Sequence, residues 1–186
     1  MVYFQTEDII LRDHTMDDFD NHHRLLSDPL TLYYWPDIGS SDTKDNRVNL
    51  KMAVDEAQNI NRDKFFFAMI CRHSGDYLGS IGYTIEAVTP VGSIAEVGYA
   101  ILPQFRGKGY TTKALAAVIK YAFTQGGVYR LRTGCLAENA ASERVMQKNG
   151  MTKEAHFKHH SWHEGEMKDR VEYRILRSEF LLHFPQ

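Results

Sequence analysis

The sequence has few cysteines, almost no net charge and no long apolar run. Its two cysteines, Cys71 and Cys135, are far apart and form no C-x-x-C pair, so we expect reduced thiols and a cytoplasmic protein. The formal net charge of -2 gives no general electrostatic support for binding nucleic acid or an anionic membrane. No apolar stretch approaches the roughly 20 residues of a membrane-spanning helix, and the first residues lack the pattern of a signal peptide.

Two glycines and two cations lie between an expected strand and an expected helix. Residues 104–109 read Q-F-R-G-K-G and follow the apolar run 96–103. A helix start offers unpaired N–H groups and partial positive charge, and glycine lets the backbone approach an anion closely. Arg106 and Lys108 add two positive charges, so the segment predicts a ligand with several phosphates. The dinucleotide pattern fails at Thr112 and no Walker sequence occurs; a glycine-rich turn without ligand is the plain alternative.

The pattern of apolar residues predicts one α/β (α+β) domain over residues 1–186. The expected helices run from Thr15 to Asp28-Pro29, from the turn 38–41 to about Asn61, over 115–122 and over 140–148. Strands are expected at 4–13, 64–72, 77–87, 94–102, 128–136, 151–160 and 167–176. This order predicts a mixed sheet of about seven strands with helices on both faces.

The loop resembles the coenzyme A pyrophosphate loop of the GNAT acyltransferase superfamily. Residues 96–99 resemble that family's fourth strand, and residues 130–136 its fifth. The segment 139–151 is similar to the N-x-x-S helix and following turn of the branch that acetylates ribosomal-protein N-termini. The resemblance implies a mostly antiparallel sheet whose fourth and fifth strands splay apart around the pantetheine arm. Lys113 and Met151 depart from the branch pattern, which leaves the acceptor open.

The same resemblance implies acetyl-CoA as a co-substrate, and no metal is expected. The expected contacts with it come from the end of the fourth strand, the loop, the next helix start and the N-x-x-S helix: Ile101, Leu102, Gln104, Phe105, Arg106, Gly107, Lys108, Gly109, Tyr110, Thr111, Asn139 and Ser142. Unpaired N–H groups of the splayed strand, over 97–101, are expected to stabilise the oxyanion of the transfer.

Three polar residues are candidates for the chemistry itself. Glu96 is expected to accept the amine proton, and its plain alternative is a solvated or ion-paired strand glutamate. Ser142, matching the serine of the ribosomal branch, is expected to protonate the departing sulfur, with an ordinary helix-start serine as the alternative. Asn139 is expected to hydrogen-bond the pantetheine amides, to cap the helix, or both.

Other features carry weaker signals. The aromatic residues Tyr33, Tyr34 and Trp35 lie between the first two expected helices and are predicted to form the acceptor wall, or else to pack structurally. Histidines at 156, 159, 160 and 163 fall on opposite faces of a strand, which disfavours a zinc site. Cys135 as a covalent acetyl carrier is disfavoured against a small buried residue.

The sequence therefore predicts an N-acetyltransferase that moves an acetyl group directly to a primary amine. A protein N-terminus is the first candidate acceptor. The alternatives are a small amine such as an aminoglycoside, polyamine or amino acid, and a non-catalytic module that binds acetyl-CoA. We expect no nucleic-acid or membrane partner, and a monomer or a homodimer.

Overall fold

A computed structural model of the protein describes residues 2–183. The chain divides into two compact units, one made of Met1–Thr84 and Gly98–Val118, the other of Ile85–Val97 and Ile119–Gln186. Within the described residues, eight strands are joined in the order β1-β2-β3-β4-β5-β6-β8-β7. In the same part of the chain, no helix is both long and apolar enough to cross a bilayer.

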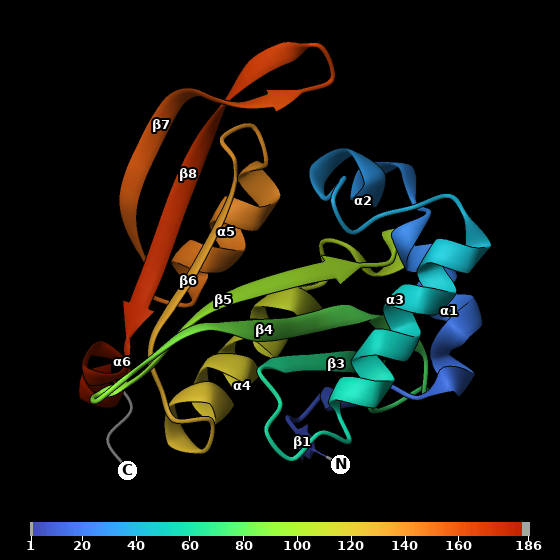
Figure 1. The fold of residues 1–186 in the computed structure, drawn as a ribbon, viewed down its shortest axis with the longest axis horizontal. Helices are drawn as coiled ribbons and strands as arrows, with labels where there is room; N and C mark the ends of the chain where they lie inside the picture. Colours follow the sequence, from blue (N-terminus) through green and yellow to red (C-terminus); the bar gives the residue numbers. More distant parts are fainter. Residues whose placement is uncertain (1, 184–186) are drawn as a thin grey trace. The chain divides into compact units, whose positions relative to one another are not determined.

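The first unit combines antiparallel strands with helices (Figure 1). Antiparallel pairing joins β1 to β2, β2 to β3 and β3 to β4. Helix α3 contacts both α1 and β3, so helices cover this part of the sheet. The elements are β1 (Tyr3–Gln5), β2 (Ile9–Asp13), η1 (Met16–Asp18), α1 (Phe19–Leu26), α2 (Pro29–Tyr34), α3 (Thr43–Glu56), β3 (Lys64–Cys71), the start of β4 (Tyr77–Thr89), the end of β5 (Gly92–Ile101), η2 (Pro103–Phe105) and the start of α4 (Tyr110–Thr124).

Strand β3 forms the centre of this unit because its apolar run leaves no polar face. Phe67, Ala68 and Met69 are consecutive and all fully buried, as expected for a strand covered on both sides. Leu25 of α1 and Leu50 of α3 are also fully buried. The helices therefore use their apolar faces to complete the core.

Two local expectations for this unit differ from the structure. The strand expected over 4–13 is broken into β1 and β2 by a turn in which the Thr6 N–H donates to Ile9 O at 2.8 Å. The Asp28-Pro29 pair, expected to end a helix, instead begins α2. Asp28 accepts a hydrogen bond from the Thr31 N–H, and Pro29 occupies the first turn, where its missing N–H costs nothing.

The second unit is built on strands β6, β8 and β7. Strand β5 pairs with β6 in parallel, from Ser93 opposite Val128 to Glu96 opposite Arg132, and parallel neighbours require a crossover such as α4. Strands β7 and β8 form a long antiparallel hairpin (Figure 1). The further elements are the end of β4, β6 (Val128–Leu136), α5 (Ala140–Lys148), β7 (Thr152–His163), β8 (Glu166–Leu176) and α6 (Arg177–His183).

Candidate active site

The segment after β5 forms an exposed loop supported by the core of the first unit. The Leu102 N–H donates to Leu78 O at 2.8 Å, and Phe105 packs against a buried cluster that includes Leu102. Gly107 and Gly109 then adopt φ angles of 74° and 82°. A side chain is disfavoured at such angles whatever the space around it. The backbone conformation of the loop therefore favours glycine at both positions.

The surroundings of these two glycines are open. A Cβ atom built on Gly107 or Gly109 meets no other atom within 4 Å. Among the described residues, the backbone N–H groups of 107–109 donate no hydrogen bond to another protein group. α4 begins at Tyr110, so its first N–H groups adjoin the loop. This arrangement fits the phosphate groups of a coenzyme A molecule.

The two cations of the loop are used differently. Arg106 donates from Nε to Ile101 O at 3.3 Å and forms an ion pair through Nη2 with Asp28. Burial alone would raise the pKa of Asp28, but the hydrogen bonds from Arg106 and Thr31 outweigh it and lower that pKa. Lys108 is exposed and lies 5.5 Å from the centroid of the Phe105 ring. Asp28 thus offsets one of the two positive charges expected beside the loop.

Asp28 also connects the loop to the aromatic segment, because it caps α2. Tyr33 and Tyr34 lie at the end of that helix, with ring centroids 4.9 Å apart in an edge-to-face arrangement. Trp35 packs on the backbone of β5, where a Cβ atom added to Gly98 would lie 2.9 Å from the indole. The first unit therefore brings together the loop, the aromatic segment and the end of β5.

Glu96 lies on β5 in the second unit, directly opposite Arg132 of β6. The Arg132 guanidinium approaches the Glu96 carboxylate at 3.3 and 3.5 Å. Partial burial raises the pKa of Glu96 above its ordinary value, although the charge of Arg132 lowers it. Glu96 is thus ion-paired, which is the structural role considered as the alternative to catalysis. It is also more basic than an exposed glutamate, which suits a proton acceptor.

Asn139 and Ser142 lie together at the start of α5. The Asn139 Oδ1 atom accepts from the Ser142 N–H at 3.1 Å, which is the helix-cap arrangement. The Cys135 thiol donates to Asn139 O at 3.9 Å. Burial, and then the charge of Glu143, raise the pKa of Cys135 to about 11. Cys135 is therefore protonated near neutral pH, which disfavours a thiolate acetyl carrier.

The histidines of β7 and its turn do not gather around one point. His156 and the backbone N–H of His159 both contact the Asp169 carboxylate, at 3.1 and 2.9 Å. His160 contacts Ser161, and His163 is buried. Among the described residues, no three His, Cys, Asp or Glu side chains form a group that could hold a metal.

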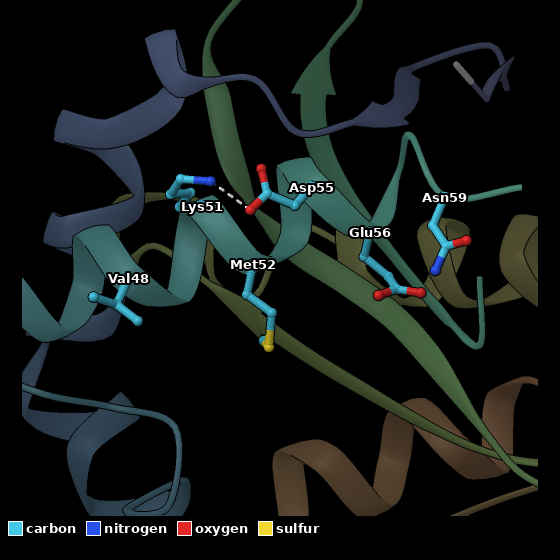
Figure 2. Close-up of a pocket in the computed structure, with 6 residues that line it drawn as sticks. All are labelled: Val48, Lys51, Met52, Asp55, Glu56 and Asn59. Carbon is cyan, nitrogen blue, oxygen red and sulfur yellow. Dashed lines mark hydrogen bonds and ion pairs between the residues drawn. The ribbon is translucent and has the colours of Figure 1, made fainter. Parts of the chain in front are cut away.

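A separate hollow of about 420 Å³ lies on the outer side of α3 (Figure 2). Its lining includes an exposed ion pair between Lys51 and Asp55 at 2.5 Å. None of the residues predicted from sequence lines it; the lining residues are Val48, Lys51, Met52, Asp55, Glu56 and Asn59.

Sequence reasoning missed the partners of the predicted residues. Asp28 pairs with Arg106, and Arg132 pairs with Glu96, yet neither pairing was predicted. The only signal for Arg132 was the spacing of Arg130 and Arg132 by two residues on a strand, which places both on one face. That spacing does not identify which carboxylate either arginine meets.

Comparison with known proteins identifies the family. Residues 8–152 match the acetyltransferase (GNAT) domain family, and the chain belongs to that family. The protein named uncharacterized N-acetyltransferase YnaD, from Bacillus subtilis, is 28% identical over 96% of this chain and 99% of its own length. The chain is thus a GNAT N-acetyltransferase, a family whose acyl donor is acetyl-CoA.

Two solved structures share the fold at lower identity. One is a ribosomal-protein-S5-alanine acetyltransferase from Vibrio fischeri, with a TM-score of 0.81, 18% identity, and coverage of 96% of this chain and 98% of the other. The second is a spermidine N-acetyltransferase from Vibrio cholerae in complex with CoA and spermine. It has a TM-score of 0.79 and 18% identity, and covers 95% of this chain and 99% of the other. Both are mixed α/β folds of the type described above.

Proposed function

We propose that this acetyltransferase moves the acetyl group of acetyl-CoA directly to a primary amine, with a protein N-terminus as the first candidate acceptor. The observation that carries the proposal is the open loop of Gly107 and Gly109 immediately before α4, which suits a diphosphate. The two structural relatives are named for acetylation of a ribosomal protein and of spermidine. Those names support an amine acceptor, but they do not distinguish a protein acceptor from a polyamine.

In this proposal the loop residues bind and orient the donor. The backbone N–H groups of 107–110, with Lys108 and Arg106, hold the diphosphate, and the side-chain amide of Asn139 bonds the pantetheine arm. Tyr33, Tyr34 and Trp35 form the acceptor wall. The expected divergence of β5 and β6 stays a prediction, and it would leave backbone N–H groups of 97–101 available to stabilise the oxyanion.

The proton transfers are assigned to Glu96 and Ser142. The amine nitrogen attacks the thioester carbon, and Glu96 accepts the proton that nitrogen loses, through a bridging water. As the carbon–sulfur bond breaks, Ser142 donates its hydroxyl proton to the sulfur. The proton that Glu96 accepted then passes through water to Ser142, which restores both side chains. The free thiol of coenzyme A and the acetylated amine are the products. A raised pKa for Glu96 brings the base closer to working pH, where general-base catalysis is efficient.

The ionisation of the acceptor favours an N-terminus over a lysine. An α-amino group has a pKa of about 8, whereas that of a lysine side chain is about 10.4. Near neutral pH an appreciable fraction of the first is already neutral, against roughly a thousandth of the second. A weak base such as Glu96 then suffices for an α-amine.

A small polyamine is the second candidate acceptor, and one observation favours it. Glu86, Glu96 and Glu172 all lie within 4 Å of the Arg132 guanidinium, and Arg170 also pairs with Glu172, so three carboxylates meet two cations. The remaining negative charge on this face would attract a polycation. A peptide with a free N-terminus, the same peptide with a blocked N-terminus, and spermidine separate the two candidates in a thiol-release assay.

The function is tested by calorimetric titration with coenzyme A followed by thiol release from acetyl-CoA. We expect binding at micromolar ligand, and release that depends on a free amine. Glu96→Gln should lower kcat at least tenfold, with partial recovery as pH rises, while the exposed Glu7→Gln serves as the charge-matched control. No binding at millimolar ligand would refute the proposal, and tight binding without release across the amine panel would instead indicate a non-catalytic module.

The remaining parts of the proposal concern location and assembly. We place the protein in the cytoplasm as a single catalytic domain over 1–186, acting as a monomer or a homodimer. The free, buried thiols of Cys71 and Cys135 suit a reducing compartment. Light scattering after size-exclusion chromatography measures the assembly, and a mass above that of two chains would contradict it.

A further inference from the structure

The Arg132 guanidinium lies among three carboxylates from three different strands. Its Nε atom donates to Glu86 of β4 at 2.7 Å, and Nη2 contacts the other oxygen of the same carboxylate. Its distances to Glu96 of β5 are 3.3 and 3.5 Å, and Glu172 of β8 lies at 3.8 Å. All four residues belong to the second unit.

The strand register explains this arrangement. Glu96 and Arg132 are direct partners in the parallel β5–β6 pair, so both side chains project from the same face of the sheet. Glu172 is the antiparallel partner of Gly134. A Cβ atom on Gly134 would lie 2.3 Å from a Glu172 oxygen, so a larger residue there would force that carboxylate to shift. The Glu172 carboxylate is further fixed by Arg170 at 2.6 Å.

We propose that Arg132 is a positioning residue for the acetyl transfer, which orients the Glu96 carboxylate and keeps it ionised while Glu86 and Glu172 hold the guanidinium in place. The inference rests on the proposed role of Glu96 as the base. It assigns to Arg132 a task that involves no contact with either substrate.

The distances from the Arg132 guanidinium to the two carboxylates support this role. Arg132 makes its short, paired contacts with Glu86, and only longer ones with Glu96. A short bidentate pair would occupy both Glu96 oxygens and make the carboxylate a poor proton acceptor. The longer contact leaves Glu96 able to accept a proton, while the nearby positive charge still favours its ionised form.

The charged groups that face Glu96 act in opposite directions. Burial raises the pKa of Glu96, Arg132 lowers it, Glu86 and Glu172 raise it, and Arg170 lowers it. Arg132 is the largest of the lowering influences. Without it, three carboxylates would share one face of the sheet, and one of them would hold a proton more readily.

The test uses two variants with opposite expected effects. Arg132→Gln should raise the pKa of Glu96 by about one unit, the low end of the effect of an adjacent opposite charge, because both side chains are partly exposed. Glu86→Gln should lower the pKa of Glu96, because it removes a like charge and releases Arg132 toward Glu96. Arg130→Gln is the matched control, since Arg130 pairs with Glu154 at 3.0 Å, and it should cause no shift.

Carboxyl-carbon NMR titration of the full chain measures these pKa values, and the Glu96→Gln variant assigns the Glu96 resonance. The acid limb of the pH–rate profile for thiol release should shift in the same directions. In Arg132→Lys the acid limb should lie close to that of the unmodified protein, because the positive charge is kept. An unchanged Glu96 resonance in both Arg132→Gln and Glu86→Gln would overturn the inference. Shifted resonances with an unshifted profile would remove Glu96 as the base, and with it the role of Arg132 in the acetyl transfer, while leaving acetyl-CoA binding and thiol release unaffected as evidence for the proposed function. Glu86→Gln keeps the test decisive if Arg132→Gln does not fold.

Discussion

Replacing Gly107 by alanine separates the ligand-binding role of the loop from its structural role. Gly107 has a φ of 74° and open space around it. Gly75, in the turn after β3, has a φ of 78° and also meets no atom within 4 Å. A Cβ atom in this left-handed region costs about 1–2 kcal/mol. Gly107→Ala and Gly75→Ala should therefore destabilise the fold by about the same amount.

Only Gly107→Ala should weaken coenzyme A binding, because a Cβ atom there obstructs the approach of a phosphate to the backbone. A tenfold loss of affinity corresponds to about 1.4 kcal/mol, and we expect at least that. The destabilisation should lower Tm by roughly 2–4 °C per kcal/mol in both variants. Calorimetry and thermal unfolding measure the two effects. Equal affinity for coenzyme A in the two variants, at equally lowered Tm, would refute a phosphate site at this loop.

Three further predictions address other residues. Burial lowers the pKa of His22 to about 4, so as the pH falls from 6.5 to 4 the unfolded chain binds a proton at His22 before the folded chain does. The free energy of unfolding should therefore fall over this range, by up to about 1.4 kcal/mol per pH unit. A free energy of unfolding that stays constant in urea titrations over the same range would contradict this. Cys135→Ala should keep kcat within about threefold, because the buried thiol is protonated at working pH, and a covalent acetyl-enzyme seen by mass spectrometry would disprove that reasoning. Gly98→Ala should displace the Trp35 indole from β5, and should therefore raise KM for the acceptor more than Kd for coenzyme A. Equal changes in both constants would argue against the assignment of Trp35 to the acceptor wall.

The order of strands and helices could be predicted from sequence because most elements carry an unambiguous apolar pattern. The strand expected over 128–136 is β6 without change, and the helix expected over 140–148 is α5. The loop of 104–109 also lies where expected, between a strand and a helix. In each of these segments local propensity, turn residues and apolar spacing agree with one another.

The failures come from residues that allow two interpretations. Asp followed by Pro can end one helix or begin the next, since aspartate is a common N-cap and proline is tolerated in the first turn. In this chain the pair begins α2 at Pro29, while α1 has already ended at Leu26. The break between β1 and β2 is similar, because Thr6 forms a turn within a run that otherwise continues the alternation of a strand.

Long-range charge pairing is the part of the candidate site that sequence could not supply. Arg106 and Asp28 are 78 residues apart, and Arg132 and Glu96 are 36 apart. An isolated charged residue in a sequence has many possible partners, and only the register of the strands and the placement of α2 choose among them. The predicted roles of Arg106 and Glu96 therefore depend on the ion-pair partner that each residue meets in the folded chain.

This pairing changes what each residue can contribute to the reaction. If Asp28 fully neutralised Arg106, the loop would attract a diphosphate mainly through Lys108 and the backbone N–H groups. Asp28→Asn tests this, because asparagine still caps α2 while the negative charge is removed. Coenzyme A should then bind more tightly at low salt, and the gain should shrink as salt screens the freed guanidinium. Weaker binding in this variant would mean that Asp28 serves chiefly to aim Arg106 at the phosphates, and that the ion pair is part of the donor site.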